Sequence, residues 1–286
     1  MLAVLASGAL SAAAAAQSEA ADIDTAHNII DVGLASKDPT VRAGAVSATG
    51  MIAKSQSVRN RIEGFLSDKD VDVRVAATET LADLGSDASS TQALENVLNT
   101  DPVPEVQFAA AKALYKLKDL KGQEALENIL YEKITTKSGL LTREKRRVST
   151  SFHSVHGATV FILETGGGLV PVPGAGEGLG ELGHLMSDTA LSPRATVVVL
   201  LGREHSVTAD NLLRFSLKDK DWTVRSSAAL LIALTARKDM RQYLVPLLSD
   251  GDQKVRFRAA GAYLHLVGAS APRDLNEPSP AATKDK

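Results

Sequence analysis

Apolar residues recur at helical spacing along most of the chain, and each apolar stripe follows a short repeated motif. The motif reads Asp-x-x-Val-Arg, and its clear copies begin at Asp38, Asp70, Asp221 and Asp252. Two degenerate copies lie at 104–107 and 192–194. We call the last residue of each copy its anchor, which gives the set Arg42, Arg74, Gln107, Arg194, Arg225 and Arg256.

The residues after each anchor predict a helix with one buried face. The third position holds Ala45, Ala77, Ala110, Val197, Ala228 or Ala259, and the seventh holds Thr49, Leu81, Leu114, Leu201, Ile232 or Tyr263. Positions three and seven share one side of an α-helix, so they form a small-then-large apolar stripe. The aspartate four residues before the arginine can accept backbone N–H bonds at the start of that helix.

Further apolar stripes precede these helices, so the repeating unit is a helix pair. They lie at 58–66, 93–98, 125–130, 212–217 and 243–248. The anchors are 31 to 33 residues apart, except for one interval of 87 residues between Gln107 and Arg194. One pair cannot bury its own stripes, so the pairs must stack. We predict an all-α solenoid of about six helix pairs stacked in sequence order, with the fourth interrupted by a Gly-rich insert.

The motif at this period resembles the HEAT repeat family, particularly its phycobilisome-lyase-type branch. The resemblance covers residues 38–117 and 193–266. It implies that the aspartates and arginines of neighbouring repeats pair in a ladder made of Asp38, Arg42, Asp70, Arg74, Asp221, Arg225, Asp252 and Arg256. Gln107 departs from the pattern, so the ladder is expected to break in the third unit.

The repeats divide the chain into five segments. Residues 1–17 are a predicted signal peptide, 18–136 the N-terminal repeats, 137–189 an insert, 190–269 the C-terminal repeats and 270–286 a disordered tail. The insert begins with basic residues and becomes rich in glycine, which disfavours a stable helix. A short apolar run and an alanine string precede Gln17, although no basic residue precedes Lys37. We expect export to the periplasm or the medium if this signal is real, and a cytoplasmic protein otherwise.

Composition and charge narrow the function. Hydrophobic residues make up 44% of the chain and aromatic residues only 4%, which favours closely packed helices over sheets. The net charge of −2 provides no general attraction for nucleic acid. The chain has no cysteine, so it offers no thiol nucleophile and no cysteine that could hold a bilin.

Other candidate chemistry is weak. His153 and His156 share one helical face but lack a third metal ligand. No histidine precedes a glutamate, as it does in HEAT-type metal oxygenases. The glycines at 166–168 and 174–178 lack the Gly-Lys-Ser/Thr sequence of a phosphate-binding loop. We predict no catalytic residue, no metal and no cofactor.

These observations favour a non-enzymatic scaffold or module that binds a protein or peptide. In the family that the chain resembles, the second helix of each pair lines the inner side of the rod. Positions two, five and nine after an anchor point away from the core, and they nominate Glu79, Asp83, Lys112, Lys116, Arg258 and His265 as binding residues.

Two alternatives involve the insert. An enzyme or lyase-like accessory could form a small-molecule pocket there, and a membrane-associated scaffold could use the Gly-rich hairpin. Arg143, Arg146 and Arg147 are further candidate binding residues within the insert. For the scaffold we expect a protein or peptide partner rather than a nucleic acid, and the third interpretation adds membrane contact through the insert.

Overall fold

The structure is a computed structural model that describes residues 2–130 and 192–269, and it consists there of helices joined by short turns. The N-terminal half contains α1 (Leu2–Leu34), α2 (Pro39–Ile52), α3 (Gln56–Glu63), η1 (Gly64–Ser67), α4 (Val71–Asp83), α5 (Ala88–Thr100), α6 (Pro104–Lys116) and α7 (Leu120–Leu130). The C-terminal half contains α11 (Pro193–Leu201), α12 (Val207–Ser216), α13 (Trp222–Leu234), η2 (Lys238–Tyr243), η3 (Val245–Ser249) and α14 (Gln253–Val267). The all-α prediction is confirmed.

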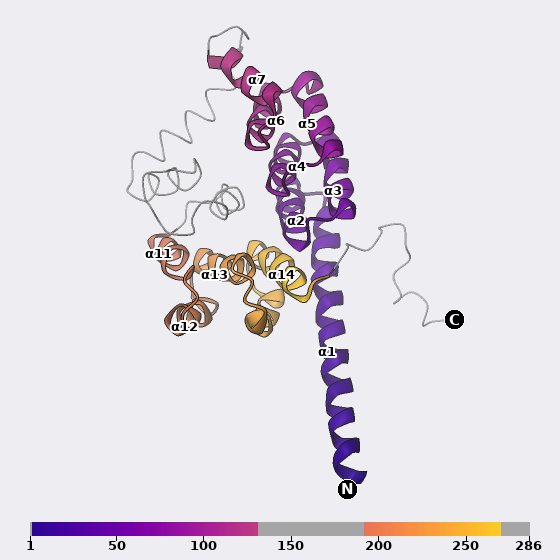
Figure 1. Ribbon diagram of the computed structural model, residues 1–286, viewed down its shortest axis with the longest axis vertical. Helices are drawn as coiled ribbons and strands as arrows, with labels where there is room; N and C mark the ends of the chain where they lie inside the picture. Colours follow the sequence, from indigo (N-terminus) through magenta and orange to yellow (C-terminus); the bar gives the residue numbers. More distant parts are fainter. Residues whose placement is uncertain (1, 131–191, 270–286) are drawn as a thin grey trace, which may run out of the picture.

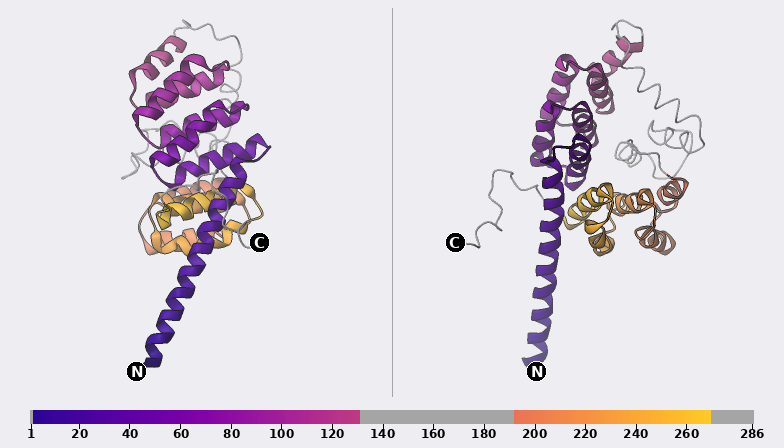
Figure 2. Two further views of the ribbon diagram at one scale, coloured as in Figure 1. Left: turned by 90° about the vertical axis from the view of Figure 1, so that its right-hand side faces the viewer. Right: turned by 180° about the vertical axis from the view of Figure 1, so that it is seen from behind.

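The helices form two rows along a bent rod (Figure 1). The inner row contains α11, α13, α14, α2, α4 and α6, which are the helices that follow the repeated motifs. The outer row contains α12, the short helices η2 and η3, α1, α3, α5 and α7. Two views at right angles show the same stacking of successive pairs (Figure 2). This arrangement is an α-solenoid.

The motif aspartate starts the inner helices as its position predicts. Asp38, Asp70, Asp221 and Asp252 are the N-cap residues of α2, α4, α13 and α14, and each side chain accepts a bond from the backbone N–H two residues later. The bond from the N–H of Thr40 to Asp38 is 2.9 Å long. Such caps satisfy N–H groups that have no partner within the helix.

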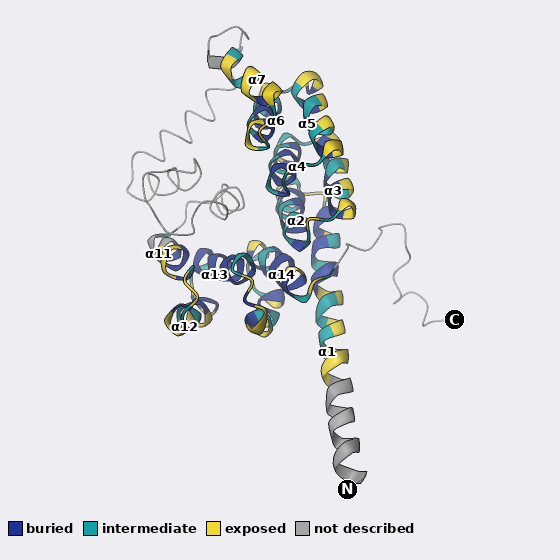
Figure 3. Ribbon diagram, in the orientation of Figure 1, coloured by how far each residue is buried: buried dark blue, intermediate teal, exposed yellow. Residues whose placement is uncertain are grey.

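The predicted stripe forms the core between the two rows (Figure 3). In five of the six inner helices, the residues three and seven after the anchor are at most 2% exposed. The exception is α11, whose Val197 and Leu201 are 47% and 57% exposed. The stripe was predicted to be buried there too, and that prediction is wrong, because α11 stands at one end of the row.

The order of stacking also differs from the prediction. Helix α14 packs against both α1 and α2, so the last repeat of the chain joins the first repeat at the middle of the rod. Among the described helices, the two ends of the rod are therefore α7, packed on α6, and α11. These helices were predicted to belong to one interrupted unit, but they lie at opposite ends.

One aromatic side chain defines the junction between α14 and the first repeat. The ring of Phe257, which is 5% exposed, lies against glycines of both helices of that repeat. A Cβ atom at Gly33 would approach the ring to 2.4 Å, and one at Gly44 to 3.3 Å. On the opposing helix, a Cβ at Gly261 would lie 2.8 Å from the carbonyl oxygen of Ala48. Glycine is required here because the helices approach too closely for a larger side chain.

Helix α1 extends beyond the rod at its N-terminal end (Figure 1). Between residues 15 and 34, its buried side chains include Ala26, His27 and Ile30. Residues 15–18 are exposed. None of the helices in the described ranges has the length and apolar character needed to span a membrane.

Candidate binding surface

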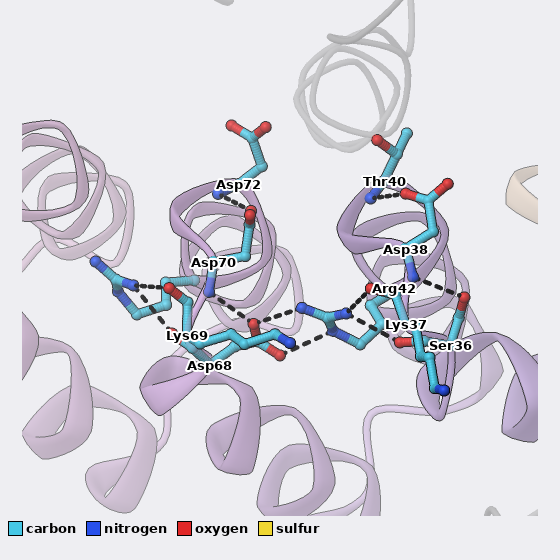
Figure 4. Close-up of polar contacts among 10 residues, drawn as sticks. Ser36, Lys37, Asp38, Thr40, Arg42, Asp68, Lys69, Asp70 and Asp72 are labelled. Carbon is cyan, nitrogen blue, oxygen red and sulfur yellow. Dashed lines mark hydrogen bonds and ion pairs between the residues drawn. The ribbon is translucent and has the colours of Figure 1, made fainter.

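Charged side chains run along the edge of the rod where the inner helices begin, and they join successive repeats (Figure 4). Arg42 forms two bonds with Asp68 of the next repeat, from Nε to Oδ2 at 3.0 Å and from Nη2 to Oδ1 at 2.8 Å. Its third contact goes back to its own loop, from Nη1 to the carbonyl oxygen of Ser36 at 2.9 Å. The guanidinium therefore fixes both the loop and the neighbouring repeat.

The same arrangement recurs along both halves of the rod. Arg74 contacts Asp101 through Nε at 2.7 Å and Nη2 at 3.1 Å. Arg225 contacts Asp250 through the same two atoms at 2.7 Å each. The side chains of both pairs are largely buried. Two parallel hydrogen bonds from one guanidinium to one carboxylate make a strong ion pair. Arg194 pairs with Asp219, although its own side chain is half exposed.

The acidic partners are not the residues that the family resemblance implied. The implied aspartates were Asp38, Asp70, Asp221 and Asp252, which cap their own helices instead. The ladder partners are Asp68, Asp101, Asp219 and Asp250, which lie two residues earlier in the loop. A side chain that closes the first turn of its own helix points along that helix, so it cannot also reach the preceding repeat.

A signal for these residues is present in the sequence. In three clear copies of the motif, an aspartate also stands two positions before the first one, as in Asp68-Lys-Asp70. The first copy has Ser36 at this place. The complete signature is therefore Asp-x-Asp-x-x-Val-Arg, in which the first aspartate accepts the arginine of the preceding repeat.

The ladder is interrupted at two places along the rod. Gln107 donates to the carbonyl oxygen of Asp101 at 2.7 Å, so it keeps the contact with its own loop without carrying a charge. Arg256 likewise bonds the carbonyl oxygen of Asp250 at 2.6 Å. The repeat next to it in the rod presents Ser36 where the others present an aspartate. The junction of α14 and α2 thus depends on apolar packing rather than on the ladder.

The ladder changes the ionisation of its members. Burial raises the pKa of the Asp68 carboxyl, but bonds from Arg42 and from the N–H of Asp70 outweigh this effect and hold the pKa below its usual range. The same balance, with Arg225 as the partner, lowers the pKa of Asp250. Both carboxylates are therefore charged at neutral pH.

We expect Asp68→Asn to weaken the fold at neutral pH but not in acid. A folded-state pKa below the unfolded value near 4 gives stability that is present above that value and is lost as the pH falls through the folded pKa. At pH 7 the free energy of unfolding of the variant should be about 1 to 3 kcal/mol lower than that of the unmodified chain. This difference should disappear as the pH falls below about 4. Urea unfolding across this range measures the effect.

Asp38→Asn is the matched control, because asparagine caps a helix as well as aspartate does and Asp38 forms no part of the ladder. Its effect should be small at every pH. An Asp68→Asn deficit that persisted in acid would show that the charge of Asp68 is not what stabilises the contact.

The nominated binding residues of α4 and α6 lie side by side on the inner row. Asp83 of α4 forms an ion pair with Lys116 of α6, and the lysine is exposed. Lys112 lies over the ring of Phe108 with its Nζ 5.5 Å from the ring centre. Glu79 occupies the position in α4 that Lys112 occupies in α6. The structure therefore pairs Asp83 with Lys116, and Glu79 and Lys112 stand one turn earlier on the same two packed helices. We call the four residues Glu79, Asp83, Lys112 and Lys116 the α4–α6 surface.

The two nominated residues of α14 lie elsewhere on the inner row. His265 is exposed in the last turn of α14. Arg258 is not an ordinary surface side chain, because burial lowers the pKa of its guanidinium to about 10. Helix α2 separates both residues from the α4–α6 surface, so they form no common site with it.

The remaining predictions about candidate chemistry concern residues outside the described ranges. These are the basic residues Arg143, Arg146 and Arg147, the histidines His153 and His156, the insert at 137–189 and the tail at 270–286. Within the described ranges, no group of three or more His, Cys, Asp or Glu side chains is placed to hold a metal ion.

Stacked helix pairs, an internal core stripe and a ladder of charged residues define an α-solenoid of the repeat type. A model of the HEAT repeats matches residues 29–115 and 62–133 of the chain. Residues 29–133 of the chain therefore consist of HEAT repeats. The more specific resemblance to the phycobilisome-lyase-type branch stays a prediction.

Two other comparisons add little. An engineered protein of known crystal structure is 17% identical, with 85% of this chain and 97% of that chain covered and a TM-score of 0.25. A score this low does not establish a common arrangement of helices. No curated protein sequence matches the chain.

Proposed function

We propose that the protein is a non-enzymatic scaffold that binds a protein or peptide through the α4–α6 surface. The observation that carries this proposal is that these four charged residues lie on α4 and α6, two packed helices of the inner row. Asp83 and Lys116 are joined by an ion pair, which holds an acidic helix beside a basic one. Neighbouring positive and negative strips of this kind favour one orientation of a charged partner over the reverse.

The two rows of helices have different roles in the rod. The inner helices bury positions three and seven in the core between the two rows. The opposite side of each inner helix therefore faces away from the outer row. A solenoid offers this extended surface without any change in its core. We also propose that the chain is exported through the predicted signal segment at 1–17, and the exposure of residues 15–18 leaves the predicted cleavage region near Gln17 accessible.

Exchanging the charges of one ion pair tests the surface while leaving the pair intact. We expect the double variant Asp83→Lys, Lys116→Asp to stay folded, because the attraction between the two helices is kept. A partner that reads the charge pattern should be lost. The measurement is affinity capture from an extract of the native host, with the captured proteins quantified by mass spectrometry.

The matched control exchanges a pair in the outer row, Glu95→Lys with Lys121→Glu, which joins α5 to α7. Proteins captured by the unmodified chain and by this control, but not by the inner exchange, would support the proposal. Identical capture by all three would contradict the assignment to the α4–α6 surface.

A further inference from the structure

The two ends of the rod are chemically unlike ordinary solenoid ends. Terminal repeats usually carry a polar outer face, because nothing covers them. Here the end at α11 exposes Val197, Leu200 and Leu201 to 47%, 46% and 57%. The end at α6 and α7 exposes Tyr115 to 57% and Leu120 to 80%. Both ends therefore present apolar side chains to water.

The exposed side of α11 is the side that every other inner helix buries. Its three residues stand three, six and seven positions after the anchor. At position six the other inner helices have Ala48, Thr80, Ala113, Leu231 and Ala262, which are at most 4% exposed. Positions three and seven are equally buried in those helices. The bare face is thus a side that the other inner helices pack against neighbouring helices, and on α11 it has no neighbour among the described residues.

The geometry of an internal junction shows what such a neighbour would supply. Between α2 and α4, position eight of the first helix meets position six of the second, since a Cβ at Gly50 would lie 2.2 Å from Cγ2 of Thr80. Position eight of α6 is Tyr115, and position six of α11 is Leu200. The exposed residues at the two ends are therefore the two halves of one such junction.

The order of the helices leads to the same pairing. Among the described helices, α7 is a first helix with no second helix after it, and α11 is a second helix with no first helix before it. In sequence order they belong to the same unit, but one chain holds them at opposite ends of the rod. A second copy of the chain can bring them together.

We propose that the protein associates head to tail, with the α6–α7 end of one copy packed on α11 of the next. The contact is heterologous, because two different surfaces meet, and every copy carries one of each. Tyr115 of one copy then faces Leu200 of its neighbour, and the inner row continues from one molecule into the next.

Two variants, each with one end blocked, test this contact. Tyr115→Lys blocks the α6 end and Leu201→Lys blocks the α11 end, and both side chains are exposed, so the helical fold should be kept. Sedimentation velocity of the full chain should show masses that grow with concentration, whereas each variant alone should stay a monomer. An equimolar mixture of the two should give a species of twice the monomer mass and nothing larger, because only one compatible pair of ends remains.

Val32→Lys is the matched control, since Val32 is 63% exposed on α1 near the middle of the rod. It should associate as the unmodified chain does, and circular dichroism checks that all variants are folded. A wild-type chain that stays monomeric at every concentration would overturn the proposal. So would a blocked variant that still polymerises, or a mixture that forms no dimer.

Discussion

Replacing Phe257 by alanine should destabilise the protein by about 3 to 5 kcal/mol, the range for removing a buried phenylalanine side chain. The ring fills the space that Gly33 and Gly44 leave at the junction of α14 with the first repeat. This junction has no bidentate ladder pair, so packing must hold it. Equilibrium unfolding in urea measures the loss.

Two control substitutions and one further test of the same junction separate this effect from general sensitivity. Phe215→Ala removes a ring that is 72% exposed and should change stability by less than about 0.5 kcal/mol. Gly64→Ala meets no atom within 4 Å and should be harmless. Gly33→Ala should destabilise, although alanine normally favours a helix by about 1 kcal/mol, because the new methyl group would strike the Phe257 ring. A stabilising Gly33→Ala would mean that the last repeat does not pack on the first.

Replacing Arg74 by methionine should cost a similar amount, about 3 to 5 kcal/mol, for an electrostatic reason. Methionine keeps much of the apolar stem, but it leaves the carboxylate of Asp101, which is 6% exposed, without its bidentate partner. A buried charge without a partner is more costly than the absence of the pair. The free energy of unfolding at neutral pH is the measurement.

Arg241→Met is the matched control, because Arg241 and its partner Glu19 are 40% and 41% exposed, so water can solvate the carboxylate that is left. Its expected cost is below about 1 kcal/mol. The double variant Arg74→Met, Asp101→Asn should regain part of the loss, since the amide oxygen can still accept the N–H of Val103. Equal costs for Arg74→Met and Arg241→Met would contradict a buried ladder.

The sequence predicts the helices well because each stripe is a local property. Ala77 and Leu81 share a face whatever the neighbouring repeats are, and both are fully buried. The capping role of Asp70 is equally local and is confirmed. These features depend on helical geometry within one repeat, which sequence spacing encodes directly.

The order of the repeats could not be predicted in the same way. Every repeat carries similar stripes, so one junction looks much like another in the sequence. The residues that distinguish the junction of α14 and α2 are Gly33, Gly44 and Phe257, which belong to three helices. Their complementarity appears only when these helices are side by side.

The exposure of the candidate binding residues could be predicted only in part. Positions five and nine correctly placed Glu79, Asp83, Lys112 and Lys116 outside the core, because the face of a helix follows from its period. The same rule failed to distinguish Arg258, whose guanidinium is buried. Burial of that kind depends on the neighbouring segments, and helical period carries no information about them.

The packing of α14 on the first repeat has a consequence for how the chain folds. Most solenoids add each new repeat to the one made just before it, so their contacts stay short in sequence. Here Phe257 must find Gly33 across more than 200 residues, and a ribosome completes the N-terminal repeats long before their partner exists. The groove that receives Phe257 is therefore open to water during synthesis, and its closure is a late, entropically costly search. Folding of this rod should be paced by that single long-range encounter rather than by the growth of successive repeats.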